Sequence, residues 1–291
     1  MKSHTIRFAL GAILVASATP AFAQDDEQGD ALLRESHQSV YTGDWLSVGA
    51  GVVYSPSYDG SDDYVISPLP IVQGKLGGIG INPRPGGLAL DFIPDADGEV
   101  AFSAGVAARI NRNRASQIKD PVVKLYGKLD TAVEVGPTLG VSFPAVLNPY
   151  DSLSFNVDAL WDVAGAHKGM TINPSVTYFT PVSRGAAVSL SVSASHVDDD
   201  YADYYYSVPT LNTLAPEDTL PGFQAKGGFD SVGVNLLAGV DLDGDLTNGG
   251  FALIVLGGYS KMLGDAKRTP FTSIRGDDDQ WMLAAGVGYT F

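Results

Sequence analysis

Residues 281–291 of this chain read WMLAAGVGYTF. Successive side chains of a β-strand point to opposite faces, so the odd-numbered positions form one bulky apolar face that includes Trp281, Tyr289 and Phe291. The even-numbered positions form a face of mostly small side chains. A soluble protein rarely leaves such a strand at a free edge, because an exposed edge invites aggregation. The stretch is therefore typical of the strand that closes a transmembrane β-barrel by pairing with the first strand.

The amino end has the features of an export signal. Lys2 and Arg7 flank the start of a short apolar stretch, and Ala21-Phe22-Ala23 supplies a small-residue cleavage site. This pattern is typical of a secretory signal peptide cleaved after Ala23, the alternative being a buried N-terminal helix. We therefore expect export to the outer membrane of a Gram-negative cell. The predicted parts are a signal peptide at residues 1–23, a periplasmic lead at 24–43 and an outer-membrane β-barrel domain at 44–291.

Composition narrows the possible functions. The chain carries 33 acidic and 18 basic side chains, a formal net charge of −15 at pH 7. Such a charge argues against binding nucleic acid or an anionic surface through a basic patch. The chain has no cysteine, so neither disulfides nor thiolate metal sites are available. Gly, Pro and Asp recur throughout the chain instead of clustering at one boundary, which indicates a single domain.

Period-two alternation recurs along the chain and predicts an all-β fold with twelve strands. The predicted strands cover residues 44–54, 64–73, 77–82, 87–92, 99–110, 131–143, 152–163, 170–181, 186–197, 230–242, 250–261 and 279–291. Short turns alternate with longer outer connections, as expected when both ends of the barrel chain are periplasmic. The segments at 77–82 and 87–92 are short for a spanning strand, which needs about 9 to 11 residues, so a ten-stranded barrel is the alternative.

Within the strands, the alternation separates apolar from polar side chains. In residues 152–163, Phe155 and Trp161 share one face, whereas Asp158 and Asp162 share the other. Outer-membrane barrels alternate lipid-facing apolar and lumen-facing polar residues in this way. A soluble sandwich shows the same alternation with the apolar face as its core. The export signal, the closing strand and the alternation of loop lengths favour the barrel.

Prolines interrupt several predicted strands. Proline has no N–H to donate to a strand ladder, so sheets confine it to edges and bulges. Bulges or irregular pairing are therefore expected at Pro68, Pro70, Pro137 and Pro174.

The predicted lumen carries charged residues. Arg109 and Glu134 lie near the outer ends of neighbouring strands, and both should point inward and pair. Further negative charge on the inner wall is expected from Asp91, Asp158, Asp162 and Asp241. A channel lined in this way would favour cations. The alternative is a polar but closed interior, plugged by the loop at residues 198–229 with its Tyr204 and Tyr205.

No catalytic site, metal site or cofactor is predicted. A barrel hydrolase needs a Ser nucleophile beside a His base, and after the leader the chain offers only His37, His167 and His196, none with a suitable partner. The acidic runs at residues 198–200 and 277–279 border outer loops. Carboxylates there could hold divalent cations near lipopolysaccharide phosphates, but charge runs usually mark a solvated rim, which we favour.

Several local patterns, taken in order, resemble one family. They are Trp45, residues 54–63 (YSPSYDGSDD), Pro68-Leu69-Pro70, residues 201–208 (YADYYYSV), Tyr259, residues 263–266 (LGDA), Thr269-Pro270 and residues 286–291 (GVGYTF). Their order and spacing are similar to those of the MipA/OmpV outer-membrane proteins, across the whole chain after the leader. Two departures from the family pattern are Thr269, where Ser is expected, and Tyr206-Ser207, where Phe-Gly is expected. Both leave the function within the family open.

The resemblance implies a non-enzymatic scaffold that links a membrane-bound lytic transglycosylase, MltA, to a bifunctional peptidoglycan synthase. Fold alone does not settle function, so two alternatives stay open: a narrow cation-preferring channel, and a surface-interaction protein or adhesin. The expected partners are outer-membrane lipid and lipopolysaccharide, the barrel assembly machinery through the closing strand, and the murein hydrolase and synthase. The short periplasmic turns count against the scaffold, and the lead at residues 24–43 is the longer element able to reach a partner.

Overall fold

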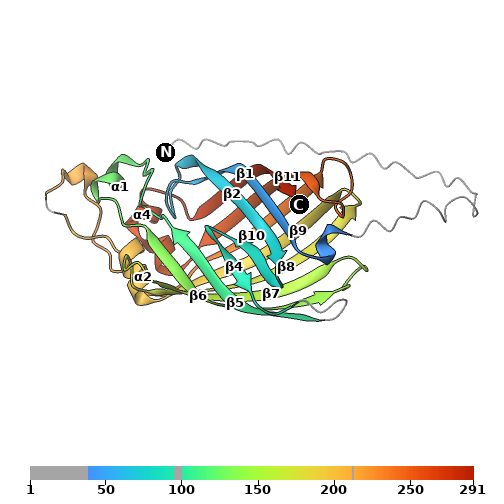
Figure 1. Ribbon diagram of the computed structural model, residues 1–291. Coiled ribbons are helices and arrows are strands. Elements are labelled where there is room, and N and C mark those ends of the chain that lie inside the picture. Colours follow the sequence, from blue (N-terminus) through green and yellow to red (C-terminus); the bar gives the residue numbers. More distant parts are fainter. Residues whose placement is uncertain (1–38, 95–99, 212) are drawn as a thin grey trace, which may run out of the picture. The chain divides into compact units, whose positions relative to one another are not determined.

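The computed structural model describes residues 39–94, 100–211 and 213–291. This part of the chain forms one closed antiparallel barrel of twelve strands, in which each strand pairs with its neighbours in sequence and β1 pairs with β12 (Figure 1). The strands are β1 Trp45–Pro56, β2 Tyr64–Leu76, β3 Ile79–Arg84, β4 Gly87–Asp91, β5 Ala101–Asn111, β6 Ala132–Pro144, β7 Ser152–Asp162, β8 Met170–Ser183, β9 Ala186–Val197, β10 Gly228–Asp241, β11 Gly250–Met262 and β12 Asp279–Thr290.

Each predicted strand is present, and the ten-stranded alternative is wrong. Strands β3 and β4 are short, but they pair with each other and with their neighbours inside the wall. The predicted signal peptide, its cleavage site and most of the predicted lead lie outside the described residues.

Short helices occupy the connections between strands. They are α1 Pro121–Leu125, α2 Asp199–Tyr206, α3 Gly264–Arg268 and α4 Pro270–Ser273, with 3₁₀ turns at Val40–Thr42 and Pro216–Asp218. In the described part of the chain, no helix has the length and apolar character needed to cross a membrane.

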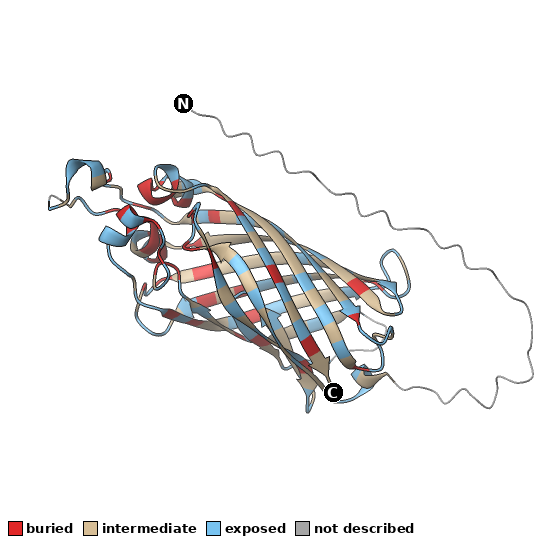
Figure 2. Cartoon of the chain, turned by 90° about the horizontal axis from the view of Figure 1, so that it is seen from above, coloured by how far each residue is buried: buried red, intermediate tan, exposed pale blue. Residues whose placement is uncertain are grey.

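The strands alternate in exposure as the sequence predicts. In β12, Trp281, Leu283 and Val287 are exposed, whereas Ala284 between them is buried inside the barrel. Exposed and half-buried residues alternate along the wall in Figure 2, with buried ones among them. Because one closed sheet carries its apolar face on the outside, the soluble sandwich is excluded.

The barrel closes at the strand that the sequence singled out. Strand β12 pairs with β1 from Ser47–Thr290 to Tyr54–Leu283. The backbone N–H of Phe291 extends this ladder by donating to the carbonyl oxygen of Leu46, at 2.9 Å. Trp281, Tyr289 and Phe291 share the outer face, and the rings of Tyr289 and Phe291 meet edge to face. The closure that the alternation predicted is confirmed.

The prolines have two different outcomes. Pairing is interrupted at Pro137 and Pro174, as expected for residues that cannot donate to the ladder. Pro68 and Pro70, by contrast, lie in an uninterrupted register between β1 and β2, so the bulge expected there is wrong. Their nitrogens face away from β1, and no β1–β2 hydrogen bond is lost. The irregular pairing lies on the other edge, because β2 pairs with β3 only at residues 74–76.

Candidate functional site

Four outer loops, in their described parts, pack together over one end of the barrel. We call them the cap: residues 57–63, 112–131, 198–211 with 213–227, and 263–278. Helices α1, α2 and α4 belong to the cap (Figure 1). One apolar cluster packs Tyr201, Tyr205 and Tyr206 of α2 against Met262. A second cluster contains Tyr58, Ile118, Val122, Val123, Val208, Leu220 and Phe271. The loop tyrosines are therefore part of a packed layer at the outer end.

Local capping explains why the cap helices begin where they do. The Asp120 carboxylate accepts from the backbone N–H of Val123 at 2.8 Å, and Pro121 fills the first helical position of α1. In the same way, Asp198 accepts from the N–H of Tyr201 at the start of α2. The acidic run at residues 198–200 thus forms an N-cap and first turn, where negative charge is favourable.

Polar contacts join loops that are far apart in the sequence. The Arg275 guanidinium donates to the Asp120 carboxylate at 2.6 Å. Arg114 lies 4.0 Å from the centre of the Phe271 ring and donates to the carbonyl oxygen of Tyr205. These contacts connect the loops after β5, β9 and β11 into one layer.

Under the cap, the inner wall holds the pair that the sequence predicts. Arg109 and Glu134 are register partners on β5 and β6, and the Arg109 Nε donates to the Glu134 Oε2 at 2.7 Å. The Glu134 side chain is fully buried. Its other oxygen accepts from Asn111 at 3.0 Å and lies 3.3 Å from the His167 Nε2. A buried carboxylate needs such a set of donors to offset its loss of hydration.

His167 is a member of this site that the sequence analysis missed. It lies in the short β7–β8 loop, is buried, and packs edge to face against Tyr201. Its Nδ1 accepts from the backbone N–H of Gly169 at 3.0 Å, which leaves Nε2 as the donor to Glu134. Both ring nitrogens therefore have partners. Nothing in the loop sequence marks this role, because the acidic partner comes from a different strand.

The four acidic residues predicted for the lumen have different surroundings. Asp158 accepts from the Arg84 Nε at 2.8 Å and from the Thr138 hydroxyl at 2.5 Å. Asp162 accepts from backbone N–H groups of the outer loop that follows it. Asp158 is thus neutralised by an arginine, and Asp162 holds a loop.

The other two predicted lumen carboxylates also accept backbone hydrogen bonds. Asp241 accepts from the N–H groups of residues 243–245 and closes the β10–β11 turn. Asp91 accepts from the N–H groups of Ile93 and Ala104. The structure does not bring Asp91, Asp158, Asp162 and Asp241 together into a shared acidic lining.

The inner wall has two contrasting halves. Strands β5 to β8, together with Arg84 at the end of β3, form the polar half, which carries the Arg109–Glu134 and Arg84–Asp158 pairs. Strands β11, β12, β1 and β2 form the apolar half, in which a Cβ added to Gly286 would lie 2.9 Å from the Cδ1 of Ile71. The inward positions of the apolar half include Val53, Leu69, Ile71, Ile254, Leu256, Met282 and Ala284.

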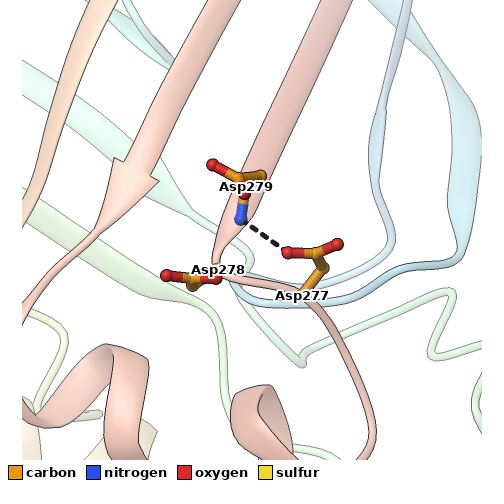
Figure 3. Close-up of side chains that lie close together, drawn as sticks. All are labelled: Asp277, Asp278 and Asp279. Atoms are coloured by element: carbon orange, nitrogen blue, oxygen red, sulfur yellow. Dashed lines mark hydrogen bonds between the residues drawn. The ribbon is translucent and has the colours of Figure 1, made fainter.

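The acidic run at residues 277–279 forms a cluster at the outer rim (Figure 3). Asp278 lies 2.8 Å from the Lys261 Nζ and 2.7 Å from the Lys267 Nζ, and Asp279 also contacts Lys261. Hydrogen bonds from Lys261 and Lys267 lower the pKa of Asp278 to about 2. Lysines thus supply the positive charge that balances this cluster.

A closed antiparallel barrel with an apolar exterior, short turns at one end and a loop cap at the other defines an outer-membrane β-barrel protein. The family model described as MltA-interacting protein MipA matches residues 48–291. The chain therefore belongs to the MipA family.

Solved structures with a similar fold are outer-membrane proteins of low sequence identity. One is an outer-membrane channel from Pseudomonas putida F1, with a TM-score of 0.45, 13% identity, and coverage of 88% of this chain and 98% of that one. Another is OmpT of Vibrio cholerae, with a TM-score of 0.37, 8% identity, and coverage of 85% and 97%. No curated protein sequence was found to match the chain.

Proposed function

We propose that the protein is a non-enzymatic outer-membrane anchor that binds a murein hydrolase of the MltA type at its periplasmic end. The family match over residues 48–291 supports the choice of partner class. A peptidoglycan synthase held by the same complex, contact with lipopolysaccharide, and recognition of β12 by the barrel assembly machinery belong to the same proposal. Both ring nitrogens of His167 are engaged in structural contacts, so neither is free to act as a catalytic base. This supports a non-enzymatic role.

The observation that carries the proposal is the β6–β7 turn at the periplasmic end. Leu147 and Tyr150 project from this turn with 78% and 77% of their surfaces exposed. Large apolar side chains gathered at one exposed place are typical of protein interaction sites. The periplasmic end of β8 adds the exposed side chain of Val182, and the β10–β11 turn adds that of Leu242.

The β6–β7 turn is held in one conformation by a single carboxylate. Asp151 accepts from the backbone N–H groups of Val146, Leu147 and Asn148 and from the Tyr178 hydroxyl. Burial opposes ionisation of Asp151, but these hydrogen bonds outweigh it and lower its pKa. A turn that is ordered before binding loses less conformational entropy when a partner docks.

The test is capture of a purified MltA-type transglycosylase by the refolded barrel in detergent. The double variant Leu147→Asp with Tyr150→Ala should lose most of the binding. Ile274→Asp is the matched control, because Ile274 is also exposed but lies in the cap. Retention of full binding by the double variant, or equal loss in the control, would contradict the proposed docking site.

The alternative of a cation-preferring channel gains no comparable support. The carboxylates expected to line it are engaged with Arg84 or with backbone N–H groups, and the cap packs over the outer end. The measurement that tests the channel is planar-bilayer conductance of the refolded protein, and cation-selective conductance steps would support it.

A further inference from the structure

The barrel wall contains a long stretch of strand edge without a strand partner among residues 39–94, 100–211 and 213–291. Strands β2 and β3 pair only through the three residue pairs beside the Gly77–Gly78 turn, where Leu76 meets Ile79. Above these pairs, residues 64–73 of β2 are paired to β1 alone. We call the part of the wall between residues 64–73 and the β3–β4 hairpin the seam. In Figure 1, the short β4 contrasts with the long β2, from which β3 separates it.

Strand geometry determines which backbone groups line the seam. Gly77 and Gly78 both have positive φ values, 58° and 81°, as the two central residues of a type I′ hairpin turn do. In such a two-residue hairpin, Leu76 and Ile79 exchange their backbone hydrogen bonds. The peptide groups of successive residues point to opposite edges of a strand, so the even-numbered residues of β2 direct their N–H and C=O groups towards β3. Where β3 does not pair with β2, these groups face the seam.

The hydrogen bonds on the other side of β1 lead to the same result. Phe291 donates to the carbonyl of Leu46, so the even-numbered residues of β1 face β12 and the odd-numbered ones face β2. Those odd-numbered residues are register partners of odd-numbered residues of β2. Residues 64, 66, 68, 70 and 72 therefore turn their peptide groups to the seam. Two of these five are Pro68 and Pro70, so the edge offers five carbonyl oxygens but three N–H groups.

The seam lies at the depth of the lipid. Ile66 is 67% exposed on the outer face, and Val72 on the same face is also exposed. The outer end of the seam is marked by Tyr64, which stacks on Tyr54 with ring centres 5.0 Å apart, as aromatic side chains do at membrane interfaces. Above it, the N–H of Asp59 donates to the Asn113 side chain and joins two loops of the cap.

The wall beside the seam is apolar on its inner face as well. Leu69 and Ile71 alternate with the seam-facing residues and point into the lumen, where Ile71 approaches Gly286 on β12. An unsatisfied backbone group in lipid is strongly unfavourable, so carbonyl oxygens on an open edge require hydrogen-bond donors from outside the strand. Apolar side chains beside free carbonyl oxygens favour the binding of a molecule with an apolar body and a hydrogen-bond donor. A peptide strand fits the edge poorly, because two prolines remove donors that added strands use.

We propose that the seam is a lateral portal through which a small apolar molecule with a hydrogen-bond donor, such as a long-chain alcohol, passes between the outer leaflet and the apolar half of the lumen. The donor group binds the free carbonyl oxygens of β2, and the apolar body lies against Leu69 and Ile71. This role is separate from binding at the periplasmic turns and does not depend on it.

The natural absence of cysteine makes the portal directly testable. Leu69→Cys places a single thiol on the inner face beside the seam, and Ser154→Cys is the matched control on the inner face of the polar half, where Ser154 contacts Ser142. Both variants are refolded into liposomes and treated with pyrenylmaleimide dissolved in the bilayer. Leu69→Cys should react at least about tenfold faster, because elsewhere the reagent must break backbone hydrogen bonds in lipid. Equal rates would overturn the portal.

Three further measurements test the route and the kind of ligand. A charged, water-soluble maleimide should react slowly with Leu69→Cys, and a rate equal to that of pyrenylmaleimide would show an aqueous route instead. Adding Ser67→Trp to Leu69→Cys should obstruct the seam and slow the apolar reagent, with folding checked by the gel shift of the unheated barrel. An unchanged rate in the folded double variant contradicts a route through the seam. Dodecanol should protect the thiol more than dodecane, and equal protection would exclude a donor-bearing ligand.

Discussion

The polar and apolar halves of the lumen arise from the same strand alternation but are held together differently. In the polar half, each buried charge has a defined partner, as in the Arg109–Glu134 and Arg84–Asp158 pairs. In the apolar half, contacts such as Ile71 with Gly286 involve no specific polar geometry. Unpaired buried charge is strongly unfavourable, whereas apolar surface gains free energy from any dry contact. The ion pairs of the polar half therefore hold its side chains in defined positions. The apolar half, by contrast, leaves apolar surface available for a ligand.

The largest effect that would test this contrast is loss of Glu134. Glu134→Leu leaves Arg109 and His167 without their shared acceptor, so the free energy of unfolding should fall by about 3 kcal/mol. Glu134→Gln keeps the shape and one acceptor oxygen, and it should cost less. Urea unfolding in lipid, followed by tryptophan fluorescence, measures both variants. A Leu variant as stable as the natural chain would mean that the polar half does not depend on its ion pairs.

A smaller loss is expected for Arg84, which connects the short β3–β4 hairpin to β7. Arg84→Met removes the bond to Asp158 and should lower the free energy of unfolding by about 2 kcal/mol, as for hydrogen bonds to charged groups. Combining it with Asp158→Asn should cost less than the sum of the two single losses, because the residues interact directly. Strict additivity in this double-mutant cycle would show that the pair contributes nothing as a pair.

The apolar half should respond to changes of polarity more than to changes of shape. Ile71→Ala removes half-buried apolar surface and should cost about 1 kcal/mol. Ile71→Asn keeps more volume but places an amide against the apolar half, so it should cost more than the alanine variant. Unfolding in the same urea assay ranks the two. The opposite order would show that this half of the lumen is filled with water.

The smallest effect concerns the rim above the apolar half, where Lys261 and Lys267 contact Asp278. Because the pKa of Asp278 is lowered to about 2 from its ordinary value near 4, its pairing stabilises the fold above about pH 4. That stability is lost as the pH falls from about 4 towards 2. The loss should stay below about 1 kcal/mol, since the pair is near solvent. Asp278→Asn should show a flatter profile over this range, and an identical profile would argue against the assignment.

The strands could be predicted from the sequence because period-two alternation is a local signal. Residues 281–291 alone indicate an outer face, an inner face and a closing role, and each of these is present in β12. The same alternation placed Arg109 and Glu134 on one face near the same end of adjacent strands. Register then brought them together, because neighbouring strands run antiparallel.

The seam could not be predicted, because alternation within one strand carries no information about its neighbours. Pro68 and Pro70 are the available signal, but a proline within a strand is compatible with a bulge as well as with an unpaired edge. Two prolines spaced by two residues share one edge of a strand, which is the pattern expected where that edge has no partner. The packing of the cap could not be predicted from local sequence patterns either, because Tyr205 and Arg114 meet only after two separate loops have folded.

Closure between β1 and β12 sets the order in which the barrel is completed. The hydroxyl groups of Ser47 and Thr290 lie 2.6 Å apart although 243 positions separate them in the chain. Contacts between residues so far apart form slowly, because a long segment must be ordered before they bring any gain. Strand β1 therefore lacks its second neighbour until the last strand of the barrel has folded. During that interval the edge of β1 that faces β12 is open to wrong partners.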